Sequence, residues 1–161
     1  MPDGSGNLVD GAHIFPVRVY YEDTDAAGIV YYANYLRYAE RARTELLRLL
    51  GTEHAAIRAH DGVAFAVRRC EIDYAKPARL DDRLEVRTVV TRVGGASLEA
   101  EQTVMCCGEA IVTVWVRLAC MDGDGRPARL PRPLKQALEQ QCRATGTEPR
   151  GRTKENGEQR H

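Results

Sequence analysis

Two aspartates stand between an apolar strand-like run and a long helical pattern. Residues 20–28 read YYEDTDAAG, so one residue separates Asp23 from Asp25 and three small residues follow. A carboxylate just before a helix lies close to unpaired backbone N–H groups and to the positive end of the helix dipole. Those N–H groups could polarise a carbonyl oxygen while an aspartate attacks the carbonyl carbon or deprotonates a water molecule that attacks it. The same segment could instead be a plain turn in which both carboxylates cap N–H groups.

The elements on either side of this segment follow from hydrophobic periodicity. Residues 14–21 alternate apolar and polar side chains and predict a strand. Apolar residues then recur at helical spacing from Asn34, a candidate N-cap, to Leu50, and Gly51 predicts the end of that helix. The pattern therefore places the two aspartates on a short connection into a long amphipathic helix.

The second half of the chain changes to a period of two residues. We expect strands at 64–75, 83–93, 96–106 and 110–120, with Gly94-Gly95 and Cys107-Gly108 at hairpin turns. A short helical piece near 53–60 and a short closing helix after Pro131 and Pro133 complete the prediction. One long helix followed by consecutive strands predicts an α+β fold whose antiparallel sheet wraps around that helix.

The length and the charge restrict the class of protein. At 161 residues one domain is expected, over residues 13–142, after a flexible leader at 1–12 and before a disordered tail at 143–161 that lacks large apolar residues. The 23 basic residues balance 23 acidic ones, which argues against a nucleic-acid partner. The sequence shows no signal peptide and no apolar run of about 20 residues, so we expect a cytoplasmic protein without a transmembrane segment.

Five cysteines are present without the spacing of a zinc site, and we expect free thiols and no bound metal. Cys106 and Cys120 fall on apolar runs, where cysteine usually acts as a small hydrophobic residue.

The stretch YYEDTDAAGIVYYANYLRYAERARTELL, residues 20–47, resembles the signature of hotdog-fold acyl-CoA thioesterases of the 4-hydroxybenzoyl-CoA type. It is most similar to the YbgC-like branch, which is associated with the Tol-Pal envelope machinery. The resemblance implies a hotdog fold, an antiparallel sheet wrapped around one long central helix. It also implies hydrolysis of acyl-CoA or acyl-carrier-protein thioesters without a cofactor.

The same resemblance assigns roles to residues of this chain. Asp25 becomes the catalytic carboxylate, as nucleophile or general base, and the backbone N–H of Tyr32 polarises the thioester carbonyl. Gly28, Ile29 and Val30 become substrate-binding residues. Many YbgC-like members have histidine where this chain has Tyr32, so a proton carrier is not expected at that position.

The resemblance also implies partners. Related domains form dimers or tetramers whose sites lie between subunits, and Arg68, Arg69, Lys76 and Arg92 are candidates for binding the CoA phosphates. Glu40, Arg41 and Arg43 on the long helix are candidates for contacts in a homotetramer. A functional link to Tol-Pal or to phospholipid synthesis is a further expectation.

Three other functions compete with this interpretation. An aspartyl phosphatase could begin with the same DxD and use Asp81 and Asp82 for magnesium, but the order of elements opposes the strand–helix repeats of that fold. An enoyl-CoA hydratase would need a histidine in the motif segment, and residues 14–53 contain none. A non-catalytic protein that binds acyl thioesters or an envelope complex stays open, because only an assay can exclude it.

Overall fold

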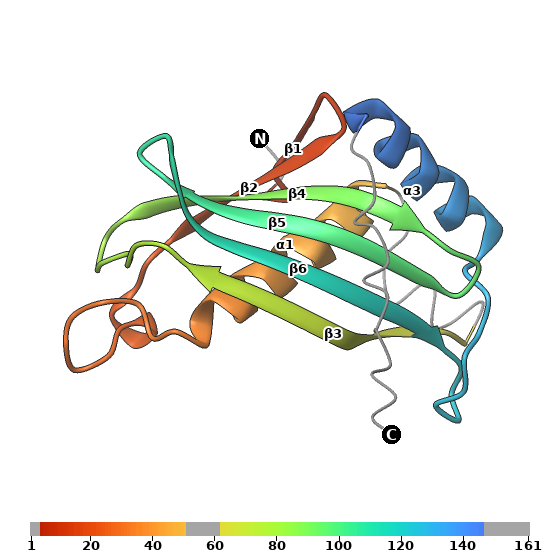
Figure 1. The fold of residues 1–161 in the computed structure, drawn as a ribbon, viewed down its shortest axis with the longest axis horizontal. Coiled ribbons are helices and arrows are strands. Elements are labelled where there is room, and N and C mark those ends of the chain that lie inside the picture. Colours follow the sequence, from red (N-terminus) through yellow and green to blue (C-terminus); the bar gives the residue numbers. More distant parts are fainter. Residues whose placement is uncertain (1–3, 51–61, 147–161) are drawn as a thin grey trace, which may run out of the picture.

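A computed structural model describes residues 4–50 and 62–146 of the chain. A single antiparallel sheet packs one face against a long helix. A shorter helix packs at the end of the sheet that lies away from the start of the long helix (Figure 1). The strand order is β1-β2-β4-β5-β6-β3. The strands are β1 (Asn7–Val9), β2 (Ala12–Arg18), β3 (Ala64–Tyr74), β4 (Arg83–Val93), β5 (Ser97–Cys106) and β6 (Glu109–Met121).

Helix α1 (Asn34–Leu49) packs mainly against β2, β4 and β6. Its buried face includes Tyr35, Tyr38, Ala39 and Ala42, which recur at the helical spacing seen in the sequence. The two alanines carry short side chains, so the helix backbone can approach the sheet closely. The predicted α+β arrangement, a sheet wrapped around one long helix, is confirmed.

The buried apolar residues form two clusters at the two ends of α1. The loop-side cluster surrounds the first half of the helix and contains Tyr35, Tyr38, Val17 and Val30 among others. The second, the α3-side cluster, joins the end of α1 to the sheet and to helix α3 (Arg132–Thr145). Leu134 and Leu138 are the residues of α3 that are buried in it. The connection into α1 therefore packs on the loop-side cluster, separately from the α3-side cluster.

The ends of the domain differ from the expectation. Strand β1 lies within the expected leader, where it pairs with β2. Helix α3 continues past the expected boundary at 142 and ends at Gly146, whose φ is +60°. A Cβ placed on Gly11 would come within 2.8 Å of the Ala144 side chain, so the end of α3 lies against the β1–β2 turn.

Other expectations have mixed outcomes. Strand β2 stops at Arg18 because Tyr21–Asp23 form a short 3₁₀ turn instead of continuing the strand. The predicted helical piece at 53–60 and the tail from 147 onward lie outside the described residues. Within the described part of the chain, no helix is both long and apolar enough to cross a membrane. All five cysteines are free, as predicted.

Strand β3 forms an edge of the sheet and pairs only with β6 among the described strands. Its register shifts between Val67 and Arg69, which marks a bulge. Most of its side chains are exposed, with Arg68 and Arg69 ahead of the acidic pair Glu71 and Asp73. An edge of eleven residues is long for a strand that stays unpaired in solution.

Candidate active site

The segment from Thr24 to Val30 is a hydrogen-bonded loop that leads into α1. Thr24 and Val30 form an isolated antiparallel bridge, and the N–H of Asp25 donates to the carbonyl of Ile29 at 2.8 Å. The N–H of Val30 donates to the carbonyl of Ala78 at 2.8 Å, which ties the loop to the segment before β4. The loop is therefore held at both ends and presents its tip to solvent.

Asp23 is a structural residue at the base of this loop. It is 8% exposed, and its carboxylate accepts a hydrogen bond from the N–H of Tyr20 at 2.9 Å. The Asn34 side-chain amide donates to the carbonyl of Asp23 at 3.0 Å and more weakly to its carboxylate. Asn34 is therefore the first helical residue and not the predicted N-cap, which is Ala33. Asp23 fixes the direction in which α1 leaves the loop.

Asp25 lies on the exposed part of the loop. One oxygen of its carboxylate accepts a hydrogen bond from the N–H of Ala27 at 2.8 Å, which is an Asx turn. The other carboxylate oxygen has no protein donor among the described residues. Each carboxylate thus caps an N–H, but only Asp25 keeps an oxygen directed to solvent and available for chemistry.

Gly28 is required by the backbone of the loop. Its φ is +77°, a conformation that side chains with a Cβ rarely adopt. A Cβ added at Gly28 would meet nothing within 4 Å, so the glycine leaves open space at the loop tip.

Tyr32, two residues before the helix, has an N–H without an acceptor in the described part of the chain. No hydrogen bond to the described residues uses the N–H of Tyr32, although the preceding N–H, of Tyr31, donates to the carbonyl of Asp23 at 2.8 Å. The hydroxyl of Tyr74 donates to the carbonyl of Tyr32 at 3.0 Å. Tyr74 therefore fixes the orientation of the peptide that follows Tyr32, from a strand 42 residues away in sequence.

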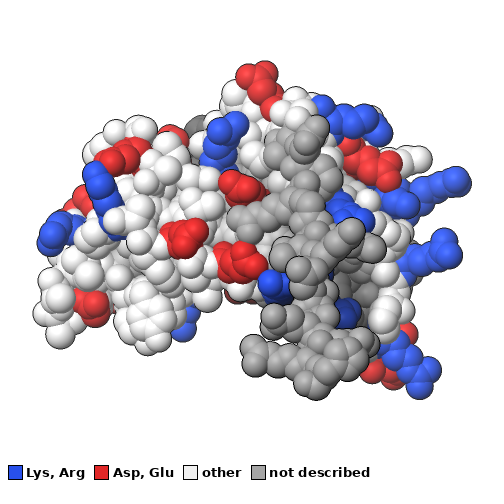
Figure 2. Space-filling model, in the orientation of Figure 1, with Lys and Arg blue, Asp and Glu red and all other residues white. Residues whose placement is uncertain are grey.

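A groove of about 310 Å³ opens beside the start of α1. It is lined by Ile29, Val30, Tyr32, Tyr35, Tyr74, Ala75, Lys76 and Pro77. Three predicted site residues, Ile29, Val30 and Tyr32, thus come together, whereas Asp25 and Gly28 lie on the adjacent loop outside this lining. Figure 2 shows the end of the molecule that carries this loop as mostly uncharged surface between separate charged side chains.

Two tyrosines of the groove, Tyr35 and Tyr74, have raised pKa values. Burial raises the pKa of Tyr35 and of Tyr74, so both phenols keep their protons at neutral pH. The Tyr35 oxygen accepts a hydrogen bond from the N–H of Ala78 at 2.9 Å. Neither phenol is suited to remove a proton from water at neutral pH.

The basic residues predicted to bind the CoA phosphates lie at different places on the surface. Only Lys76 lines the groove, where its ammonium group pairs with Glu109 of β6. Arg68 and Arg92 line an open hollow of about 700 Å³. Arg68, at that hollow, is six positions along β3 from Tyr74, a distance of roughly 20 Å. Arg69 instead pairs with Glu71 at 3.2 Å and lies over the Trp115 ring.

One predicted contact residue of the long helix points inward. Arg43 donates to the side chain of Gln102 at 2.9 Å, and burial lowers the pKa of its guanidinium group. Arg43 is thus engaged within its own chain, and its contact with another subunit stays a prediction. Glu40 and Arg41 are exposed as expected. Asp81 and Asp82 occupy the predicted turn before β4, where Asp82 accepts from the N–H of Arg79 at 2.8 Å.

Comparison with known proteins places this arrangement in a family. The Thioesterase-like superfamily matches residues 19–138, a range that includes the loop, α1 and all of the long strands. The chain belongs to this family. The hotdog fold expected from the motif is thereby confirmed, and the antiparallel sheet excludes the strand–helix repeats of the phosphatase alternative.

The chain aligns with nearly the whole length of individual relatives. The chain is 44% identical over 132 residues to the acyl-CoA thioesterase YbgC of Haemophilus influenzae, covering 81% of this chain and 97% of that protein. It is 41% identical to the acyl-CoA thioester hydrolase YbgC of Escherichia coli O6:H1, covering 78% and 95%. The crystal structure of a probable thioesterase from Bartonella henselae superposes with a TM-score of 0.72 at 37% identity, covering 74% and 99%.

Proposed function

We propose that this chain hydrolyses acyl-CoA thioesters at the groove beside the start of α1. The observation that carries the proposal is that Tyr32 lines this groove and that its N–H has no acceptor in the described part of the chain, next to a loop that presents the Asp25 carboxylate. An N–H without an acceptor can hold the oxygen on which negative charge develops as the thioester carbon is attacked. The similarity to proteins named as acyl-CoA thioesterases supports the same reaction.

In this mechanism Asp25 supplies the attacking group. Its solvent-facing oxygen either attacks the thioester carbon directly or removes a proton from the attacking water. Ile29 and Val30 offer apolar contacts to the acyl or pantetheine chain, and Gly28 holds the loop in its turn. Tyr32 contributes its N–H, which does not depend on the identity of its side chain.

The direct test is hydrolysis by the purified chain. Free thiol is measured with a panel of acyl-CoA substrates of different chain length, branching and aromatic content, alongside an acyl carrier protein thioester. Release of CoA that scales with enzyme concentration is expected for at least one acyl-CoA. A chain that binds these thioesters without turnover would instead support the non-catalytic binding protein.

We also propose that the active form is at least a dimer, joined through β3. If two copies of β3 pair antiparallel with their Cys70 residues opposite each other, Arg69 of each copy faces Glu71 of the other. The basic half of the strand then meets the acidic half, which favours self-pairing. The Tyr74 end of one copy lies beside the beginning of β3 in the second, so the groove borders the second subunit.

Three further expectations remain hypotheses of this proposal. A homotetramer would need a second interface, for which Glu40 and Arg41 are available on the exposed face of α1. A cytoplasmic location is expected from the sequence pattern, and a link to the Tol-Pal machinery or phospholipid synthesis comes from the resemblance alone. Affinity capture of the chain from its own cells, followed by identification of the retained proteins, tests that link.

A further inference from the structure

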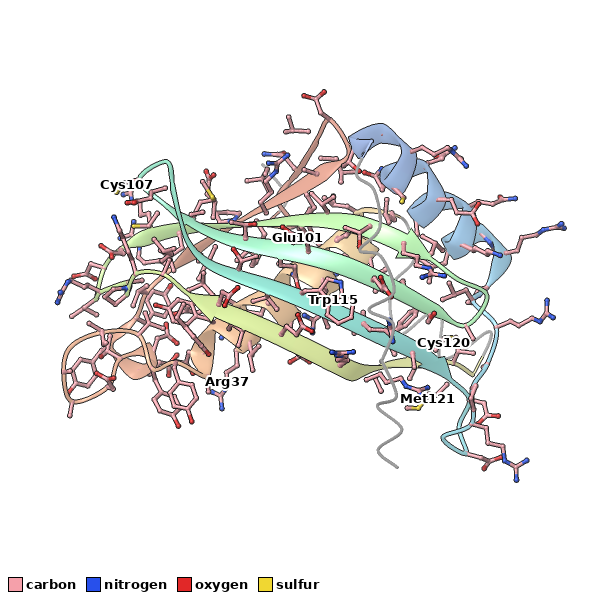
Figure 3. All side chains as sticks on the ribbon, in the orientation of Figure 1. Arg37, Glu101, Cys107, Trp115, Cys120 and Met121 are labelled. Atoms are coloured by element: carbon pink, nitrogen blue, oxygen red, sulfur yellow. The ribbon has the colours of Figure 1, made fainter. Side chains whose placement is uncertain are left out.

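Two adjacent cysteines occupy the hairpin turn between β5 and β6. Cys106 pairs with Glu109 across the strands, so Cys107 and Gly108 form a two-residue turn. Both have positive φ, +55° and +78°, which is the type I′ turn that normally takes Asn-Gly. Cys107 is exposed at the tip of the hairpin (Figure 3). A cysteine is an unfavourable choice for this left-handed position, at a cost of about 1 kcal/mol.

The turn brings the two sulfur atoms into contact. Cys106 Sγ and Cys107 Sγ lie 3.8 Å apart. Burial first, and then the neighbouring thiol, raises the pKa of Cys106 to about 11, so Cys106 stays protonated at neutral pH. The molecule therefore presents a pair of reduced thiols whose sulfurs already converge, one of them open to solvent.

The spacing of neighbouring residues favours a bridging atom over a direct disulfide. Consecutive Cα atoms are about 3.8 Å apart, whereas disulfide-linked cysteines usually have Cα atoms roughly 4.4–6.8 Å apart. A direct bond would therefore distort the turn. An atom bound to both sulfurs can leave them near their present separation and close a ring without forcing the backbone together.

We propose that Cys106 and Cys107 form a dithiol site for trivalent arsenicals. With an organoarsenic oxide, two As–S bonds form and the As=O bond breaks. The oxygen leaves as water with the two thiol protons, and arsenic stays trivalent. Because the second sulfur binds within the same turn, its effective concentration exceeds that of a free monothiol, and the ring should resist competition by glutathione.

Binding of an arsenical at this site should also alter the substrate groove. Glu109, two residues beyond Cys107, pairs with Lys76 of the groove lining. The carbonyl of Ile111 accepts from the N–H groups of Ala75 and Lys76 at 2.9 and 3.1 Å. Cys106 packs against the loop-side cluster that contains Tyr35. A ring that shifts the start of β6 would therefore move one wall of the groove.

Intact mass spectrometry tests the binding site on the purified full chain. With phenylarsine oxide and excess glutathione, we expect one phenylarsenic adduct per chain that 2,3-dimercaptopropanol removes. Cys107→Asn should abolish the adduct while keeping or raising the melting temperature, because Asn suits the turn. Cys70→Ser, which alters another exposed cysteine, should retain the adduct. Failure of the wild type to hold the adduct, or an adduct that survives in Cys107→Asn, overturns the site.

Thioester hydrolysis tests the coupling separately. Full loading with phenylarsine oxide should lower turnover by at least about twofold, as expected when one groove hydrogen bond is weakened, and dimercaptopropanol should restore it. The Cys107→Asn variant should hydrolyse substrate equally with and without the arsenical. Unchanged turnover of a fully loaded wild type would overturn the coupling. This inference concerns the turn itself, so the mass measurement holds whether or not the chain is a thioesterase.

Discussion

Replacing Asp25 by asparagine separates the chemistry of the loop from its structure. The Asp25 oxygen that accepts the Ala27 N–H has an equivalent in the asparagine side-chain carbonyl, so the Asx turn is kept. Asp25 is exposed and packs against no core residue, and such a change should alter stability by less than about 0.5 kcal/mol. The melting temperature should therefore move by no more than about 2 °C.

The effect on turnover should be much larger. Asparagine can neither attack the thioester nor accept a proton, and a positioned general base alone contributes roughly 10²–10⁴ in rate. We expect kcat to fall at least about a hundredfold, which corresponds to about 2.7 kcal/mol of activation free energy. Substrate binding, measured by calorimetry with a non-hydrolysable thioether analogue, should stay within about threefold, since the groove residues are unchanged.

Two control variants sharpen this test. Glu22→Gln removes the charge of another exposed carboxylate in the same segment and should leave turnover unchanged. Asp23→Asn should show the opposite pattern, because the buried carboxylate accepts from Tyr20 and Asn34, and losing an acceptor there costs about 1–3 kcal/mol of stability. An Asp25→Asn variant with near wild-type turnover would refute the assigned role and favour a binding protein.

Three other perturbations test separate parts of the structure. Tyr74→Phe removes only the hydroxyl that holds the Tyr32 carbonyl, in the peptide that follows the proposed N–H donor. The kcat should fall about fivefold with little change in KM, and an unchanged kcat would show that this hydrogen bond does not position the donor. Arg69→Glu should shift the dimer towards monomer in analytical ultracentrifugation, and the double variant Arg69→Glu with Glu71→Arg should restore the dimer. Arg48→Glu on α1 should leave the dimer unchanged. A double variant that stays monomeric would contradict the β3 pairing. Burial lowers the pKa of His13 from 6.5, so the unfolded chain binds the proton more readily and the free energy of unfolding should fall as the pH drops below about 6.5. Thermal melts from neutral pH to about pH 5 should show this loss, and His13→Gln should reduce it; equal pH dependence in both proteins would exclude His13 as the cause.

The long helix and the long strands could be predicted because the spacing of apolar residues in each one marks the face that is buried. Helix α1 places Tyr35, Tyr38 and Ala42 on one face, and β4 to β6 alternate apolar with polar side chains. Strand β1 gave no such signal because three exposed residues are too few to show a period. The last turn of α3 was missed because Arg143 and Ala144 are exposed, so no apolar residue marks it.

The candidate site was predictable only where it is local. Asp25, Gly28 and Tyr32 lie within one motif, and the roles that the resemblance assigns to them stay predictions. The burial of Asp23 depends on Asn34, eleven residues away, and the contact between Tyr74 and Tyr32 joins two segments whose separation follows no period. Sequence patterns carry no information on such pairs because tertiary packing of the loop against α1 and β3 brings them together.

The division of the core into two clusters means that this domain need not open as a single unit. The α3-side cluster can loosen while the loop-side cluster, with the Asp25 loop resting on it, stays closed. In native-state hydrogen exchange, amides near Leu134 and Leu138 would then exchange as one group and those near Tyr35 and Tyr38 as another. Engineering of thermal tolerance could proceed at the α3 end by cavity filling or helix stabilisation, with the end that carries the Asp25 loop left as it is.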